Sequence, residues 1–123
     1  MSEIVIYHNG RCGSSMKTLR LIREAGFEPT VIEYLQTPPT RDTLRELAAR
    51  MEVPIRALLR THEALYAEHD LGNPKWSDDE LLDEIDCHPV LLVRPIVVTE
   101  RGAALCRPPD KVLALLPQGS ERP

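Results

Sequence analysis

The sequence has no long hydrophobic run and no dense run of basic residues. No apolar stretch approaches the roughly 20 residues that a membrane-spanning helix needs, and the first residues do not have the layout of a signal peptide. The formal net charge of -4 argues against general nucleic-acid binding, because the phosphate backbone attracts a basic face. We therefore expect a cytoplasmic protein with neither a membrane nor a nucleic acid as partner.

Cysteine is also scarce, with three residues at wide spacing. An odd number so far apart does not form a disulfide framework, which favours a reducing compartment and at least one free thiol. The sequence contains no repeats. A chain of 123 residues fits one domain, which we predict over residues 1–117, followed by a polar tail at 118–123.

Hydrophobic periodicity predicts alternating strands and helices in the first half of the chain. Residues 4–7 and 30–34 are short β-branched runs typical of strands. Residues 15–25 and 40–51 carry apolar side chains on one helical face, and Gly26 is suited to end the first helix. This order predicts a βαβ unit with a right-handed crossover.

The second half begins with helices and ends with strands. A short helix is expected at 55–61, then a polar connection, then a helix that Ser77 and Glu80 start as a capping box. Residues 89–98 and 103–107 are strand candidates, and the short link between them implies an antiparallel pair.

A last helix is expected after Pro108 and Pro109. The complete order predicts an α/β fold: a thioredoxin-like mixed four-stranded sheet, with a helical insertion between the βαβ start and the ββα end. Cys12 then lies between the first strand and the first helix. Free backbone N–H groups and the positive dipole end of a helix stabilise a thiolate there, and an oxyanion beside it.

Several interpretations of the segment around Cys12 compete. A Cys-x5-Arg phosphatase loop is excluded because Thr18 stands where the arginine would be. A Cys-x-x-Cys redox motif is excluded because Ser15 stands where the second cysteine would be. A monothiol glutaredoxin motif, Cys-Gly-x-Ser, does match, and a small buried hydrophobic cysteine is a further alternative.

The other candidate residues have less specific settings. Cys87 is expected near the apolar side of its helix, and Cys106 stands alone, so no metal-binding spacing is present and no metal site is predicted. His8 is close enough to the loop that its imidazolium could lower the pKa of Cys12, although an ordinary loop histidine is an equal alternative. His62 and His69 belong to no pattern.

Five blocks distributed over nearly the whole chain resemble the glutaredoxin-coupled, ArsC-type arsenate reductases. In order they are IYHNGRCGSSMKTL, PTVIEYLQTPPTRDTL, IRALLR, HPVLLVRPIVVT and LCRPPDKVL. The resemblance implies that Cys12 attacks arsenate, that His8 favours its thiolate, and that substrate is held by Arg60, Arg94, Arg107, Gly13, Ser14 and Ser15. It also implies that the Arg94–Pro95 peptide bond is cis and faces the Cys12 loop.

With one local cysteine, the adduct between Cys12 and arsenic must be opened by an outside thiol. The resemblance implies glutathione as co-substrate and glutaredoxin as partner, with no bound cofactor and with NADPH acting only on those partners. The chain departs from the family at Gly10, where proline is usual, and at Met16, where arginine is frequent; Lys17 could supply part of that charge.

Two alternatives on the same scaffold remain. An Spx-like transcriptional regulator would bind RNA polymerase and generally use a Cys-x-x-Cys switch, against which Ser15 argues. An orphan glutathione-dependent thiol oxidoreductase would share the fold and the thiol without reducing arsenate.

Overall fold

Four short strands form the mixed sheet that the hydrophobic pattern predicts. They are β1 (Val5–His8), β2 (Thr30–Glu33), β3 (Ile96–Thr99) and β4 (Gly102–Leu105). Their order in the sheet is β2-β1-β3-β4, with β1 parallel to β2 and antiparallel to β3. The strands β3 and β4 form the predicted antiparallel pair. The α/β fold with a four-stranded mixed sheet is thus confirmed.

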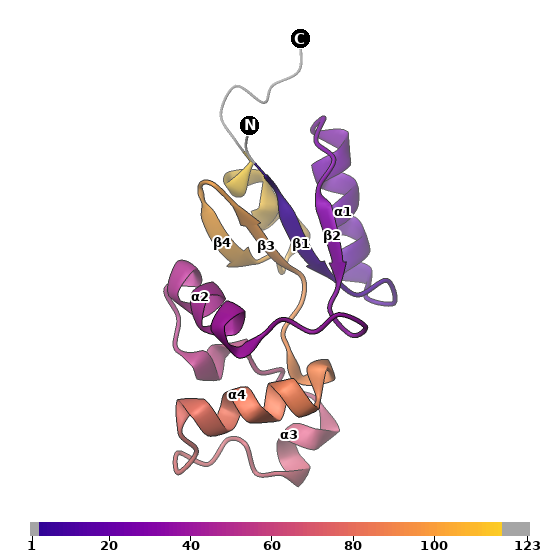
Figure 1. Ribbon diagram of the computed structural model, residues 1–123. Helices are drawn as coiled ribbons and strands as arrows, with labels where there is room; N and C mark the ends of the chain where they lie inside the picture. Colours follow the sequence, from indigo (N-terminus) through magenta and orange to yellow (C-terminus); the bar gives the residue numbers. More distant parts are fainter. Residues whose placement is uncertain (1–2, 117–123) are drawn as a thin grey trace. The chain divides into compact units, whose positions relative to one another are not determined.

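The computed structural model describes residues 3–116, which divide into two units (Figure 1). The sheet unit contains residues 3–37 and 94–116, and the helical unit contains residues 38–93. The helical unit is the insertion expected between the two halves of the sheet. The extent of a single domain stays a prediction, and the polar tail lies outside the described residues.

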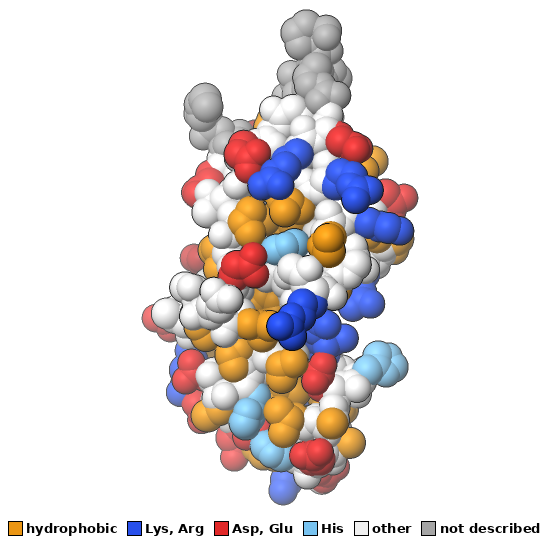
Figure 2. Space-filling view, turned by 90° about the vertical axis from the view of Figure 1, so that its right-hand side faces the viewer, with side chains coloured by type: hydrophobic (Ala, Val, Ile, Leu, Met, Phe, Trp, Pro, Cys, Tyr) orange, Lys and Arg blue, Asp and Glu red, His pale blue; other side chains and the backbone are white. Residues whose placement is uncertain are grey.

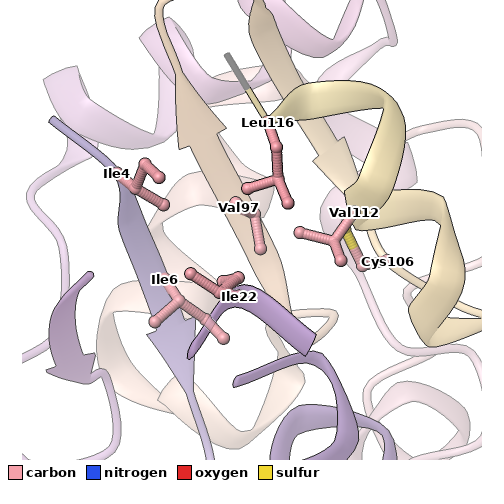
Figure 3. Close-up of a cluster of buried hydrophobic side chains, with 7 residues drawn as sticks. All are labelled: Ile4, Ile6, Ile22, Val97, Cys106, Val112 and Leu116. Atoms are coloured by element: carbon pink, nitrogen blue, oxygen red, sulfur yellow. The ribbon is translucent and has the colours of Figure 1, made fainter. Parts of the chain in front are cut away.

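One face of the sheet packs against α1 (Gly13–Glu24) and the 3₁₀ helix η3 (Pro109–Leu115), which contact each other. Figure 3 shows the buried side chains between them, which come from both ends of the sequence: Ile4, Ile6, Ile22, Val97, Cys106, Val112 and Leu116. Ile4 and Ile6 alternate along the first strand, so that they point to the same face. This core fixes the start of α1 relative to β1.

The helix α1 ends as predicted. Its cap is Ala25, and Gly26 follows with a φ of 99°, a left-handed conformation that glycine adopts without a steric penalty. The backbone N–H of Gly26 donates to the carbonyl of Arg23. The chain can therefore turn directly from α1 towards the second strand.

The helical unit contains α2 (Arg41–Met51), α3 (Ala64–Glu68) and α4 (Asp78–Cys87), with 3₁₀ turns η1 (Ile55–Leu58) and η2 (Pro89–Leu91). The predicted capping box is present at the start of α4, where Ser77 and Glu80 bond each other's backbone N–H groups. None of the described helices has the length and apolar character required to span a membrane.

Two segments have a secondary structure that differs from the prediction. Residues 89–95 do not form a strand: 89–91 make a 3₁₀ turn, and Leu92 only bridges Leu59. Prolines at both ends of this run cannot donate to a sheet ladder, which explains why it does not pair as a strand. The short helix α3 forms where a polar connection was expected. The helix expected after Pro108 and Pro109 is present, as the 3₁₀ helix η3.

Cys87 is exposed, whereas the sequence suggested the apolar side of its helix. The buried face of α4 carries Leu81, Leu82 and Ile85. Cys87 is two residues beyond Ile85, which rotates its side chain by about 200° around the helix axis and away from the core.

Candidate active site

Cys12 lies at the junction of β1 and α1, as the sequence indicates. It is the N-cap residue of α1, with an extended backbone conformation, and its carbonyl accepts the first helical hydrogen bond from Met16 at 3.0 Å. Its own N–H donates to the carbonyl of Asn9 at 2.9 Å. The loop therefore closes tightly before the helix begins, and it holds the thiol at the helix N-terminus.

Hydrogen bonds of Asn9 and Ser15 stabilise the loop that contains Cys12. The backbone N–H of Asn9 donates to the hydroxyl of the fully buried Ser15 at 3.3 Å, and the Asn9 side chain accepts from the N–H of Arg11 at 2.9 Å. Asn9 is not among the site residues predicted from the sequence. An asparagine directly after a strand is typical of such a turn and could have indicated it.

The pKa of the Cys12 thiol is below its ordinary value. Burial alone would raise this pKa, but several interactions that stabilise the thiolate outweigh it. They are, in order, the backbone N–H of Ser15, a hydrogen bond from the side chain of Arg94, the backbone N–H of Ser14, and the positive charge of Arg94. A larger fraction of the nucleophilic form is thus present at neutral pH.

Arg94 enters the site from the other end of the chain. The Arg94–Pro95 peptide bond is cis, as the family resemblance implies, and Pro95 directly precedes β3. Two of its guanidinium nitrogens, Nε and Nη1, are buried and have no hydrogen-bond partner among the described residues. Buried donors normally have partners, so these two are suited to hold an anion beside the sulfur.

His8 is the last residue of β1 and is 6 % exposed. Its Nδ1 atom is buried and has no hydrogen-bond partner in the described part of the chain. The groups that shift the pKa of Cys12 are Ser14, Ser15 and Arg94, so the expected influence of His8 on the thiolate stays a prediction.

A groove of about 600 Å³ runs along α1 from His8 and Gly10. Met16 and Leu19 supply apolar surface and Arg20 supplies charge. Met16 is 51 % exposed and lies one helical turn after Cys12, on the same side of the helix. Figure 2 shows basic and hydrophobic side chains next to one another on this face of the sheet unit.

The two other predicted arginines have different settings. Arg107 is exposed and follows the last strand in the sheet unit. Arg60 belongs to the helical unit, where it forms an ion pair with Glu63 and its side chain is 19 % exposed. The structure thus brings Arg94 to Cys12, while convergence of Arg60 and Arg107 on the same anion stays a prediction.

The two other thiols differ sharply from Cys12. Cys106 is fully buried in the core, and this burial raises its pKa to about 12, against a small opposing effect of the Lys111 charge. Cys87 is exposed in the helical unit. Cys12 is therefore the cysteine whose surroundings favour a thiolate.

The mixed sheet, the cysteine at the start of the first helix, and the cis-proline before β3 together define the thioredoxin-like class. Because Ser15 replaces a second cysteine, the site has a single thiol. The model of the ArsC family matches residues 7–115, and the chain belongs to this family.

Curated relatives and a solved structure agree with this assignment. An arsenate reductase of Escherichia coli K12 is 51 % identical over 98 % of this chain and 86 % of the relative. The structure of an arsenate reductase from Vibrio cholerae is 42 % identical and superimposes with a TM-score of 0.89, covering 93 % of this chain and 98 % of that one. The uncharacterized protein YfgD of Escherichia coli is 40 % identical over 93 % of this chain and 97 % of its own length.

Proposed function

We propose that the protein is an arsenate reductase that uses Cys12 as its nucleophile. The observation that carries this proposal is the position of Arg94, whose side chain lowers the pKa of the Cys12 thiol and has two buried donors, Nε and Nη1, without a partner among the described residues. Arsenate is a tetrahedral oxyanion, and planar guanidinium groups bind such anions through paired hydrogen bonds. Relatives that carry the name arsenate reductase support the choice of anion.

In the first step, the Cys12 thiolate attacks arsenic and forms an As–S bond, while one oxygen of arsenate is protonated and leaves as water. The negative charge that spreads over the remaining oxygens is stabilised by Arg94 and by the N–H groups at the start of α1. Those donors belong to the segment that Gly13, Ser14 and Ser15 form. Arg60 and Arg107 are proposed to add further guanidinium contacts to the same oxyanion.

The reduction of arsenate to arsenite takes two electrons, and two thiols supply them as they join in a disulfide. We propose that glutathione provides the second thiol, that arsenite then leaves, and that glutaredoxin reduces the disulfide to restore the Cys12 thiolate. NADPH acts only on those partners, and no cofactor is bound. The reaction belongs in the cytoplasm, where small thiols are kept reduced.

The groove along α1 supports the arrival of a small thiol from this side. It begins next to His8 and Gly10 and follows the helix face on which Cys12 lies. Arg20 in the groove offers a charge to a carboxylate, and Met16 offers apolar surface. A peptide thiol bound there would place its sulfur within reach of the helix N-terminus.

A coupled assay tests the proposal. Oxidation of NADPH is followed in the presence of the protein, arsenate, glutathione, glutaredoxin and glutathione reductase, and each component is omitted in turn. We expect turnover only in the complete mixture. If the protein forms a mixed disulfide with glutathione but never consumes NADPH with arsenate, the orphan thiol oxidoreductase is the correct function.

The Spx-like regulator is the remaining alternative and predicts a different result. Such a protein would bind RNA polymerase and show no arsenate-dependent turnover. Because Cys12 has no second cysteine three residues later, the chain cannot form the local disulfide that such a switch generally uses.

A further inference from the structure

Three metal-ligating side chains of the helical unit gather at one end of α4. His69 follows α3, whereas Glu84 lies in the last part of α4 and His88 caps its end. Each offers one ligand atom, and these atoms all lie within 4.8 Å of one another. Figure 1 shows α3 and α4 side by side in this unit. The site proposed for arsenate does not use any of these three residues.

The three side chains already contact one another. The Nδ1 atom of His69 lies 2.6 Å from Oε1 of Glu84, and the ring of His69 meets the ring of His88 edge-on, with centroids 5.6 Å apart. Glu84 and His88 are four residues apart, so they share one face of the helix. The fold adds His69 from a distant segment, which is why the sequence spacing alone predicted no metal site.

The backbone holds both histidines at helix ends. The N–H of His69 donates to the carbonyl of Leu65, and the N–H of His88 donates to the carbonyl of Glu84, both at 2.9 Å. The C-terminal end of a helix carries partial negative charge, which favours a cation. The ten residues of α4 make this effect larger there than at the end of the short α3.

We propose that His69, Glu84 and His88 bind a divalent transition-metal ion of the zinc class, with water as the fourth ligand. Two imidazoles and one carboxylate are a ligand set that such ions prefer. Ligand atoms around a tetrahedral zinc ion lie about 3.3 Å apart, so the widest pair must approach by about 1.5 Å. The side chains of His69 and Glu84 are 36 % and 21 % exposed, which leaves room for this rotation.

The alternative is a metal-free pair in which His69 and Glu84 only share a hydrogen bond. The two possibilities differ in the role of His88. A metal site needs His88 as a ligand, whereas the hydrogen bond between His69 and Glu84 forms without it. Zinc binding by the full-length protein, measured by titration calorimetry, distinguishes them. We expect one ion per chain, and an affinity that falls about ten-fold or more in His69→Ala, Glu84→Gln and His88→Ala.

His62→Ala is the matched control, since His62 is an exposed histidine of the same unit outside the cluster. Its affinity for zinc should equal that of the unchanged protein. Cys87→Ser tests the exposed thiol next to His88 and should also keep full affinity. Loss of binding in Cys87→Ser, or unchanged binding in His88→Ala, would overturn the proposal.

Two further measurements do not depend on these variants. Cobalt bound to the unchanged protein should show the intense visible absorption of tetrahedral coordination without a sulfur charge-transfer band, and the appearance of that band would contradict the ligand set. The thermal unfolding temperature should rise with zinc concentration, because only the folded chain brings His69 to α4. An unfolding temperature independent of zinc would likewise overturn the proposal.

Discussion

The side chain of Arg94, the residue before the cis-proline that leads into β3, interacts with Cys12, the residue that caps α1, and lowers the pKa of its thiol. The two residues come from opposite halves of the sheet unit. Their contact joins the nucleophile to a guanidinium that still has two buried donors without partners among the described residues. Charge stabilisation and anion binding are thus combined in one side chain.

Replacement of the cysteines should separate their roles. Cys12→Ser is expected to abolish arsenate reduction, because serine provides no thiolate to attack arsenic. Cys87→Ser and Cys106→Ser should keep most of the activity, since neither thiol lies at a helix N-terminus. The coupled NADPH assay measures all three, and residual turnover in Cys12→Ser would contradict the mechanism.

The pH dependence of Cys12 alkylation should report its interaction with Arg94. In the unchanged protein the midpoint of the iodoacetamide rate is expected below about 8.5, the ordinary value for cysteine. Arg94→Gln removes the charge that favours the thiolate, so the midpoint should move to higher pH, and Arg94→Lys should shift it less. The same midpoint in all three proteins would show that Arg94 does not stabilise the thiolate.

The proposed arginine contacts can be tested by conservative replacement. Arg60→Lys, Arg94→Lys and Arg107→Lys keep the charge but lose the paired geometry, so kcat/KM for arsenate should fall about ten-fold, equivalent to ~1.4 kcal/mol. Arg45→Lys is the matched control, because Arg45 is an exposed arginine paired with Asp79. Equally small effects in all four variants would place the anion elsewhere.

Arg56, which lies four residues before Arg60, is unsuitable as a control for the lysine replacements. Its guanidinium donates to the backbone carbonyls of Leu71 and Asn73, at 2.8 and 3.0 Å. Lysine cannot reproduce both bonds, so Arg56→Lys would change the stability of the helical unit.

The capping box of α4 gives a prediction about stability. Ser77→Ala removes the hydroxyl that accepts from the N–H of Glu80. The free energy of unfolding should fall by about 1 kcal/mol, a typical cost for the loss of an N-cap. Urea unfolding followed by circular dichroism measures this change.

Thr61→Ala serves as the control for Ser77→Ala, because Thr61 is an exposed residue with a hydroxyl group in the same unit but outside the capping box. Identical unfolding midpoints for Ser77→Ala and the unchanged chain would mean that the box contributes nothing.

Most of the fold could be predicted because its signals are local. Short apolar and β-branched runs indicated the strands, Gly26 indicated the end of α1, and Ser77 with Glu80 indicated the start of α4. The run at 89–95 was misread because its leucines are buried as in a strand, whereas its backbone has only the isolated bridge from Leu92 to Leu59. An apolar run indicates that a segment is buried in the protein core, but it does not indicate which hydrogen bonds the backbone of that segment makes.

The site was predictable where it follows from one segment. Cys12 at a helix start implied a stabilised thiolate, and the lowered pKa agrees with that inference. The loop contact between Asn9 and Ser15 was not predicted, because a hydroxyl bonded across six residues leaves no periodic pattern. The cluster of His69 with α4 was missed for a related reason, since its members meet only after the chain has folded.

The burial of Cys106 limits how the protein can recover after each reaction. The Cys106 sulfur lies in the core beside Val112, and its pKa of about 12 means that it does not ionise at neutral pH. This burial also keeps it from another thiol. The sheet unit therefore cannot store two electrons as an internal disulfide and wait for a reductant. In the proposed mechanism, each arsenate molecule that is reduced therefore consumes an external thiol at once, so turnover would slow as soon as the external thiol is oxidised.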